Sequence, residues 1–493
     1  MLETLEPPVP VEEMPRFDYN LVAIGGGAAG LVTSLVGSTI RARVALIEKD
    51  RMGGDCLNTG CVPSKALIAC AKRVHQLHGA EALGLQTSGK VDFAAVTRHV
   101  RQAIEQIAPN DSVERFTSLG VECFTGEARV CSPQEVEVHG RRLTTRKVVI
   151  ATGARPQVPP IPGLSEVSFS HSENLWEWKE LPQRLAVIGG GPIGCELAQA
   201  FSRLGSQVQI IHDAHHLLPR EDEDVTEAIR ERFQTEGITV HSGVRIERVE
   251  RHSGGTRIHL SSGDEGSTQQ VEVDHLLIAA GRQANTEGFG LEELGVELNP
   301  EGTIRVDDFL QTSVPHLYAC GDVAGPYQFT HMAGHQAWYA AVNALFSPWK
   351  RFAADYSVVP WCTYTDPEVA RVGLNEQEAR LQGVPYEVTS WGFEHLDRAI
   401  TDGEASGMLK ILTVPGKDRL LGVSICGPHA GELLAEYVLA MKHGLGLNAI
   451  LRTIHAYPTF AESSKLAAGV WRKQRVPSGL LKALGLFHRW QRR

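Results

Sequence analysis

The chain has 493 residues, which is enough for about three or four domains with substantial cores. Its 42% hydrophobic and 22% charged residues are typical of a water-soluble globular protein, and its formal net charge of -10 argues against broad affinity for nucleic acid. No uninterrupted apolar run reaches the ~18 residues of a membrane span, and segment 1–16 lacks the regions of a secretion signal, so we expect a cytoplasmic protein.

The first predicted element is a short apolar strand over 21–24, and a glycine-rich turn follows it. The turn precedes a helical stretch and contains Gly25, Gly27 and Gly30. Glycines in this pattern let backbone N–H groups approach a pyrophosphate at the start of a helix. A second apolar strand over 44–47 leads to Glu48, whose carboxylate is placed to hold ribose hydroxyls. This unit suits FAD or NAD.

Two cysteines follow this unit, in the sequence GGDCLNTGCVPSK at 53–65. In a continuous α-helix two residues five apart are roughly 8.6 Å apart at Cα, whereas a disulfide tolerates about 6.8 Å at most. Cys56 and Cys61 can therefore bridge only if the chain leaves the helix between them, and the glycines permit this. Pro63 and Ser64 suit the opening of a helix, with Cys61 at its positive end, where the pKa of a thiol falls.

A plain stabilising disulfide, or two buried thiols, is the alternative for this pair, and the dinucleotide unit just upstream disfavours it. The remaining cysteines are scattered and form no CxxC pair, which indicates a reducing compartment with one catalytic disulfide as the exception. They are Cys70, Cys123, Cys131, Cys195, Cys320, Cys362 and Cys426. No metal site is predicted.

The order of strand, glycines, helix and strand occurs a second time. Strand 185–188 precedes the second turn and strand 208–211 follows the helical stretch. The glycines of this turn are Gly189, Gly191 and Gly194. A lone glycine triplet is a weak signal, but an ordered repeat is a strong one. The chain is therefore predicted to bind two dinucleotides.

The two copies differ at the end of the second strand. His212, followed by Asp213, stands where Glu48 stands in the first copy. An acid at this place would favour NAD and an arginine would favour NADP, so this pair decides neither. The nearby His215 and His216 slightly favour NADPH as the nucleotide, unless they are solvated loop residues.

Three further apolar strands end in small residues. The strands at 148–150 and 276–278 lead to Gly153 and Gly281. They resemble one another, as strands would that each lead the chain out of a nucleotide domain. The third, around 318–320, leads to Asp322, an acid that can receive a ribityl hydroxyl or serve only as a turn or helix cap.

The C-terminal segment is basic and amphipathic. No acidic residue follows Glu462, whereas seven cations lie from 472 onward: Arg472, Lys473, Arg475, Lys482, Arg489, Arg492 and Arg493. Apolar residues recur near helical spacing at Leu480, Leu481, Leu484, Phe487 and Trp490. The segment is either a helix packed on its own protein or a peripheral contact with an anionic membrane.

Taken together and in order, these motifs resemble one family over nearly the whole chain, the class I pyridine nucleotide-disulfide oxidoreductases, which are flavoprotein disulfide reductases. The matching motifs are GGGAAG at 25–30, GGDCLNTGCVPSK at 53–65, ATGARP at 151–156, GGGPIGCELA at 189–198, AAGR at 279–282, YACGDV at 318–323 and HAYPTFAE at 455–462.

The resemblance implies an α/β fold with two Rossmann-like dinucleotide-binding domains, one for FAD and one for NAD(P), and a C-terminal α+β dimerisation domain. It also implies a homodimer whose active site is shared between subunits, a small-molecule or metal-ion acceptor, and no nucleic-acid partner. The expected parts are an N-terminal tail at 1–16, an FAD-binding domain at 17–156 and 283–350, an NAD(P)-binding domain at 157–282, an interface domain at 351–470 and a basic tail at 471–493.

Carried over by position, the resemblance makes Cys61 the thiol that faces the flavin and Cys56 the outer, interchange thiol. Lys65 would pair with Glu196 beside the flavin, since both need a partner to be buried, and Asp322 would bind FAD. The implied reaction takes a hydride from NADPH or NADH through FAD to the disulfide, and the Cys56 thiolate then attacks an acceptor.

The chain departs from dihydrolipoamide dehydrogenase and glutathione reductase in its last motif. Those enzymes carry a histidine before the proline, oriented by a glutamate, as acid–base partner of the outer thiol. Here Tyr457 takes that place while Glu462 remains, and a tyrosine is a poor base near neutrality. His455 is expected to be structural. Tyrosine at this place resembles mercuric reductases.

We therefore expect a mercuric reductase-like enzyme that reduces Hg(II), another metal ion or a disulfide, with dihydrolipoamide dehydrogenase as the alternative. No CxxC precedes the first glycine turn and no cysteine pair stands near the C-terminus, so a metal ion is expected to reach Cys56 directly. A third hypothesis is a redox-responsive flavoprotein whose cysteine state controls binding to a partner or a membrane.

Overall fold

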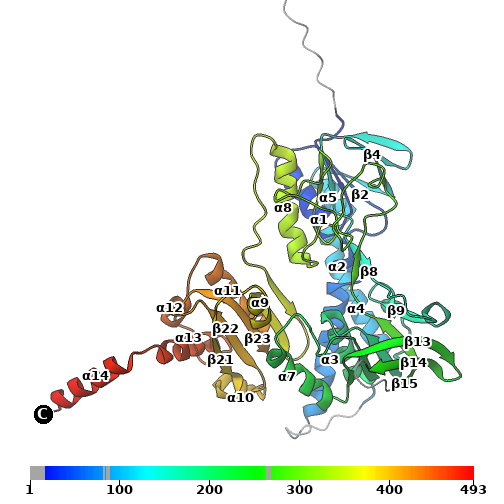
Figure 1. Ribbon diagram of the computed structural model, residues 1–493. Coiled ribbons are helices and arrows are strands. Elements are labelled where there is room, and N and C mark those ends of the chain that lie inside the picture. The colour runs from blue at the N-terminus through cyan, green and yellow to red at the C-terminus, as the bar shows by residue number, and fades with distance from the viewer. Residues whose placement is uncertain (1–16, 81–83, 85–88, 263–267, 493) are drawn as a thin grey trace, which may run out of the picture. The chain divides into compact units, whose positions relative to one another are not determined.

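The computed structural model describes residues 17–80, 84, 89–262 and 268–492, so the expected tail at 1–16 lies outside the described residues (Figure 1). The chain divides into two units. Unit 1 comprises Met1–Asn58, Gln106–Arg155 and Gln283–Ala354, and unit 2 comprises Thr59–Glu105, Pro156–Arg282 and Asp355–Arg493.

Unit 1 is built on a parallel sheet with the strand order β18-β7-β1-β2-β3. Its strands are β18 (Leu317–Ala319), β7 (Val148–Ile150), β1 (Leu21–Ile24), β2 (Val44–Glu48) and β3 (Val121–Thr125). In all strands but the edge strand β3, nearly every side chain is buried on both faces, as a covered parallel sheet requires. Helices α1 (Ala28–Thr39) and α8 (Thr330–Phe346) pack side by side on one face.

The other face of this sheet contacts an antiparallel meander. Its strands are β4 (Ala128–Ser132), β5 (Glu135–Val138) and β6 (Arg141–Thr144). Val130, Val136 and Leu143 of the meander belong to the same apolar core as Val22 and Ile150 of the sheet. The helix that carries the first cysteine, α2 (Gly54–Asn58), also belongs to unit 1.

Unit 2 contains a second parallel sheet with the order β12-β11-β10-β16-β9. Its strands are β12 (Thr239–His241), β11 (Gln207–Ile211), β10 (Arg184–Ile188), β16 (His275–Ile278) and β9 (Phe169–His171). Helix α6 (Pro192–Leu204) packs on this sheet and against α3 (Cys61–Gly79). Strands β13 (Val244–His252), β14 (Gly255–Ser262) and β15 (Thr268–Val273) form an antiparallel layer on its other face.

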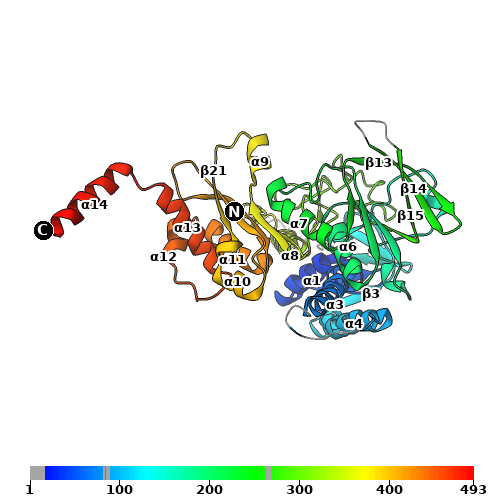
Figure 2. The ribbon, with the colours of Figure 1, turned by 90° about the horizontal axis from the view of Figure 1, so that it is seen from below.

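The rest of unit 2 is an antiparallel sheet with helices. The strand order is β19 (Pro360–Thr363), β20 (Glu368–Gly373), β23 (Leu420–Gly427), β22 (Met408–Thr413) and β21 (Glu387–Gly392). Helix α11 (Ala430–Lys442) packs on β20 and β23, and α13 (Glu462–Gln474) packs on β21 (Figure 2). Tyr437 and Trp471 fill the core between these layers.

Buried ion pairs tie this antiparallel sheet to the segment around α7 (Glu223–Thr235) of the same unit. Lys410 of β22 contacts Asp222 at 3.2 Å, and the fully buried Arg371 of β20 contacts Glu221 at 2.9 Å. Burial raises the pKa of Glu221, and the Arg371 charge opposes that shift. Removing one partner of such a pair would strand a buried charge, so these contacts fix the local geometry.

The last helix, α14 (Ser478–Gln491), has only exposed residues. Its apolar side chains, including Phe487 and Trp490, are therefore uncovered by the described part of the chain, which disagrees with the first of the two alternatives, a helix packed on its own protein. None of the described helices is both long and apolar enough to cross a membrane. The predicted fold class, with two parallel dinucleotide-type sheets and a C-terminal α+β part, is confirmed.

Candidate active site

The predicted FAD residues gather at one edge of the unit 1 sheet. All five strands are parallel, so their carboxyl ends meet at the same edge. β1 ends at the first glycine turn, β2 ends in Glu48, β7 is followed by Gly153 and β18 is followed by Asp322. Ligands of open parallel sheets bind at this edge, beyond the carboxyl ends of the strands.

Glycine suits each of the three positions in the first turn for a different physical reason. Gly25 has φ +108°, and a Cβ there would lie 2.3 Å from the Ala151 carbonyl oxygen. A Cβ on Gly30 would lie 1.7 Å from the Gly25 oxygen, so helix and turn could not pack. Gly27 caps α1 with ordinary φ, and its added Cβ would meet only the Gly54 Cα at 3.7 Å. This open backbone beside a helix N-terminus fits a pyrophosphate group.

Glu48 is held in place by backbone donors. Its carboxylate accepts N–H groups from Gly26 at 2.5 Å and from Asp50 at 2.8 Å. The side chain is therefore fixed at the end of β2, against the glycine turn. Half-buried Asp322 begins the turn after β18. Both positions fit a ligand with ribose or ribityl hydroxyls, as FAD has.

The second turn repeats this geometry at the edge of the unit 2 sheet. Gly189 has φ +122° and its added Cβ would meet the Ala279 oxygen at 2.3 Å, while a Cβ on Gly194 would lie 2.0 Å from the Gly189 oxygen. Gly191 caps α6, and a Cβ on it would find no atom within 4 Å. Gly281, with φ +114°, follows β16 at the same edge. These residues fit the pyrophosphate of NAD(P)H.

Replacing Gly191 by alanine should therefore weaken NAD(P)H binding without unfolding the protein. Its φ of -79° and ψ of -177° suit alanine, and the new methyl would occupy open space beside the α6 N-terminus. We expect the KM for NAD(P)H to rise about tenfold, which is about 1.4 kcal/mol. Steady-state kinetics and a thermal melt measure the two effects.

The matched control is Gly194→Ala, whose methyl meets the Gly189 oxygen and should lower the melting temperature. An unchanged KM in Gly191→Ala would contradict this assignment of the second turn.

His212 lies at the predicted position, after β11, but it is buried rather than free to meet a phosphate. Its Nε2 is 2.9 Å from Ser242 Oγ, and its ring lies against Gly190, where an added Cβ would be 2.8 Å from Cγ. Burial lowers the pKa of His212, so the ring is neutral near pH 7. It therefore supplies no charge for the 2′-phosphate of NADPH.

The two motif cysteines occupy two consecutive helices. Cys56 lies in α2, which ends at Asn58, and Cys61 is the first residue of α3. The chain leaves the helix between them, as a bridge requires. The second helix begins at Cys61 with Gly60 as its cap, so Pro63 and Ser64 lie in its first turn. Exposed Cys61 therefore stands at the positive end of a 19-residue helix, as predicted.

Burial makes several of the other thiols poor nucleophiles. Burial raises the pKa of Cys320 and of Cys426 to about 12, and it also raises the pKa of Cys195 and Cys362. A thiolate at any of these four positions would be costly near neutral pH.

The predicted Lys65–Glu196 pair is present in unit 2. Lys65 Nζ of α3 lies 2.7 Å from Glu196 Oε2 of α6, and the Glu196 side chain is only 6% exposed. The other carboxylate oxygen accepts the Tyr364 N–H at 2.8 Å. The Tyr364 ring also lies under the ammonium, 4.7 Å from Nζ to the ring centroid. A positive charge is thus held in place by a carboxylate and an aromatic ring.

Replacing Lys65 by methionine should leave Glu196 as a buried charge without its cation. Breaking a buried pair costs about 3–5 kcal/mol, and we expect about 2–3 kcal/mol here because the Lys65 side chain is 37% exposed to water. The melting temperature should fall, and the double variant Lys65→Met/Glu196→Gln should recover part of the loss. A double variant no more stable than the single one would contradict this account.

Tyr457 is exposed and its hydroxyl is already engaged. It donates to Asp397 Oδ2 at 2.9 Å, and this hydrogen bond together with the Asp397 charge raises the pKa of Tyr457. Glu462, the first residue of α13, adds to the same shift. A phenol with a raised pKa cannot take a proton from a thiol near neutrality.

His455 does not supply the base that Tyr457 lacks, because its ring is bound to another residue. Its Nε2 lies 2.9 Å from Glu436 Oε1, and its side chain is 7% exposed. The contact supports the expected structural role for His455.

Comparison with known proteins agrees with this geometry. The family described as "Pyridine nucleotide-disulphide oxidoreductase" matches residues 19–337, and its dimerisation domain matches residues 359–468. The chain belongs to the pyridine nucleotide-disulphide oxidoreductase family. Its predicted membership is therefore confirmed.

Individual members are similar over nearly the full chain. The dihydrolipoyl dehydrogenase of Thermus scotoductus is 36% identical, covering 93% of this chain and 98% of that protein. The mercuric reductase of Staphylococcus aureus is 34% identical, covering 92% and 82%. The solved structure of the HOCl-induced flavoprotein disulfide reductase RclA from Escherichia coli is 29% identical, with a TM-score of 0.81, covering 92% and 99%.

This pyridine nucleotide-disulphide oxidoreductase is thus an FAD-dependent NAD(P)H enzyme of the disulfide reductase type, and its dimerisation domain indicates a homodimer. Bound FAD would supply the two-electron link between the nicotinamide and a cysteine pair. The residues named above fit that cofactor set.

Two partners in this oxidoreductase site could not be found from the sequence. Tyr364 contacts the Lys65–Glu196 pair and Asp397 holds the Tyr457 hydroxyl. Neither stands in a motif, and each reaches its partner only through the fold.

Proposed function

We propose that this enzyme passes electrons from NAD(P)H through Cys56 and Cys61 to a thiol-reactive metal ion. The observation that carries the proposal is Tyr457, because its hydroxyl is bound to Asp397 and its pKa is raised. Disulfide and dithiol substrates need a base that moves a proton to or from a thiol. A soft metal ion needs only thiolate ligands.

In this proposal each candidate residue has one task. Cys56 is the outer thiolate that binds the acceptor, and Cys61, at the α3 N-terminus, is the inner thiol next to the flavin. Lys65, fixed by Glu196, favours negative charge beside it. The FAD residues are those at the unit 1 sheet edge and the NAD(P)H residues those at the unit 2 sheet edge. The proposed domain limits are the ones expected from the sequence.

The electron balance suits a metal ion. Each NAD(P)H that becomes NAD(P)⁺ gives two electrons and releases one proton. Two electrons take one Hg²⁺ to the metal or two Cu²⁺ to Cu⁺. Copper is included among the candidate acceptors because the RclA flavoprotein of Escherichia coli, 29% identical to this chain, has been solved as a Cu(II) complex.

The deciding experiment compares two steady-state assays of the purified holoenzyme. One follows NADPH and NADH oxidation with Hg(II) in excess thiol, or with Cu(II) without added thiol, and the other follows NAD⁺ reduction by dihydrolipoamide. We expect turnover in the first and little in the second. Robust dihydrolipoamide turnover would instead favour the second candidate, a dihydrolipoamide dehydrogenase, which the 36% identity to the Thermus scotoductus enzyme favours.

We also propose that the enzyme acts in the cytoplasm and that α14 contacts the anionic surface of a membrane. Along α14, Leu480, Leu484 and Phe487 share one face and Lys482 and Arg489 the opposite one, and all are exposed. An amphipathic basic helix lies in the plane of an anionic bilayer surface.

Co-sedimentation with phosphatidylglycerol vesicles tests the α14 proposal. The full chain should sediment with the vesicles, whereas a chain ending at Val476 should not. The variant Leu484→Gln/Phe487→Gln keeps every charge and should also lose binding, because the apolar face inserts. Equal partitioning of all three proteins rejects the proposal. Slow turnover with every acceptor, together with redox-dependent partitioning, would favour the redox-responsive flavoprotein.

A further inference from the structure

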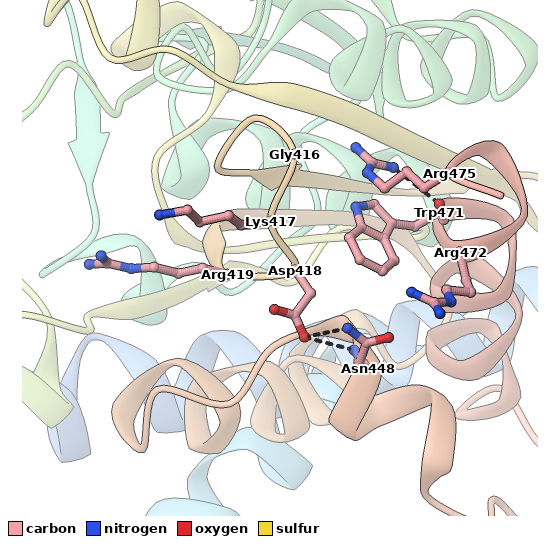
Figure 3. Close-up of a pocket in the computed structure, with 8 residues that line it drawn as sticks. All are labelled: Gly416, Lys417, Asp418, Arg419, Asn448, Trp471, Arg472 and Arg475. Atoms are coloured by element: carbon pink, nitrogen blue, oxygen red, sulfur yellow. Dashed lines mark hydrogen bonds between the residues drawn. The ribbon is translucent and has the colours of Figure 1, made fainter. Parts of the chain in front are cut away.

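A basic cavity of about 650 Å³ lies in the C-terminal part of unit 2, and none of its lining residues is among those assigned above. Its walls come from the turn between β22 and β23, from α12 (Leu447–Arg452) and from the end of α13. Figure 3 shows Trp471, Arg472 and Arg475 together on the α13 side, Asp418 against Asn448, and the Lys417 and Arg419 side chains extending from the turn, away from Trp471. The lining residues are Gly416, Lys417, Asp418, Arg419, Asn448, Trp471, Arg472 and Arg475.

The cations of the cavity outnumber its acids. Among the described residues Lys417, Arg419 and Arg472 have no ion-pair partner, and Asp418 is the one acid among the lining residues, so the lining carries a net positive charge. The acid of the cavity, Asp418, is bound to the amide of Asn448, whose Nδ2 donates to Oδ2 at 2.8 Å (Figure 3). The remaining cation, Arg475, pairs with Glu387.

An unsatisfied donor stands among these cations. Trp471 is 3% exposed and its indole Nε1 has no hydrogen-bond partner in the described structure. The Arg475 guanidinium lies over the indole, 4.5 Å from Cζ to the ring centroid, and donates to the Trp471 carbonyl at 3.1 Å. Figure 3 shows Nε1 on the side of the ring towards Arg475. A buried N–H without an acceptor is costly, and an anion would supply one.

We propose that this cavity binds a phosphate group. Phosphate offers several acceptor oxygens, which suits the forked donors of Arg472 and Arg419, the ammonium of Lys417 and the indole N–H. The phosphate comes either from a soluble phosphate ester or from an anionic lipid headgroup. The site lies next to α14 in the chain, so a headgroup held here would fix the helix near a membrane surface.

The first arm of the test is calorimetric titration of the FAD-loaded enzyme with inorganic pyrophosphate. The variants are Arg472→Gln and Lys417→Gln, and the matched control is Lys473→Gln, an exposed α13 cation that does not line the cavity. Pyrophosphate bound at the glycine turns would be the same in all of them. We expect at least tenfold weaker binding in Arg472→Gln and Lys417→Gln than in the control. Trp471→Phe removes the N–H and should weaken binding severalfold.

The second arm separates the two phosphate sources. The same variants are sedimented with vesicles of phosphatidylcholine with or without phosphatidylglycerol. Loss of binding to the phosphatidylglycerol vesicles in Arg472→Gln but not in Lys473→Gln assigns the site to a headgroup, and unchanged vesicle binding with weaker pyrophosphate binding assigns it to a soluble ester. If Arg472→Gln and Lys473→Gln behave alike in both arms while the thermal melts show folded protein, the proposal is wrong.

Discussion

Replacing either Cys56 or Cys61 by serine should reduce NAD(P)H-dependent turnover of an external acceptor by a factor on the order of 1,000. A serine hydroxyl can neither form the disulfide that receives the electron pair nor act as a soft ligand or thiolate leaving group. Cys61 stands at the N-terminus of α3, where the helix dipole favours its thiolate, and a serine hydroxyl at this place would stay protonated.

A thiol count separates the loss of the disulfide from a general loss of activity. Two additional thiols should react with a disulfide reagent after NADPH is added to the oxidised enzyme, and none in either serine variant. The control is Cys70→Ser, on the same helix α3, whose thiol pKa is raised by burial; it should behave as the parent enzyme. Two NADPH-dependent thiols in Cys61→Ser would refute the assignment.

The second large effect is expected from Tyr457→His. The phenol gives no base near neutrality because its bond to Asp397 raises its pKa. A histidine there would be flanked by Asp397 and Glu462, two carboxylates that favour its protonated form and allow proton exchange with a thiol near pH 7. General acid–base catalysis contributes about 100-fold to 10,000-fold. We expect dihydrolipoamide or disulfide turnover to rise at least about tenfold.

Tyr457→Phe is the matched control, since it keeps the ring and removes the hydroxyl. It should leave disulfide turnover as low as in the parent enzyme. The gain of Tyr457→His should fall at low pH as the imidazole becomes fully protonated and loses its function as a base. No gain at any pH between 6 and 8 would show that the missing base is not what limits disulfide turnover.

The local pattern of the sequence determined the nucleotide-binding units. Buried parallel strands appear as uninterrupted apolar runs, and β1 covers the predicted 21–24 without change. The glycine turns could be found because they are forced by short-range sterics, as the 1.7 Å approach of a Gly30 Cβ to the Gly25 oxygen shows. Pro63 and Ser64 lie in the first turn of α3, which Gly60 caps without a side-chain hydrogen bond, so the expected place of Cys61 at the start of this helix agrees with the structure.

Only the tertiary structure decided the environment of each site residue. His212 was correctly placed at the end of β11, but its burial, and hence its lowered pKa, depends on packing against Gly190 and Ser242. Lys65 and Glu196 could be paired because the motifs of a known family place them together, while their contacts with Tyr364 could not.

The sequence by itself thus determined the two dinucleotide units, the cysteine pair and the absence of a histidine before Pro458, because each depends on residues close together in the chain. The tertiary structure decided that Tyr457 is bound to Asp397, that the described residues leave the apolar face of α14 uncovered, and that a turn and a helix bring cations to one cavity beside Trp471. These depend on contacts between distant segments, and charge and burial at such contacts follow from the fold, which no local pattern encodes.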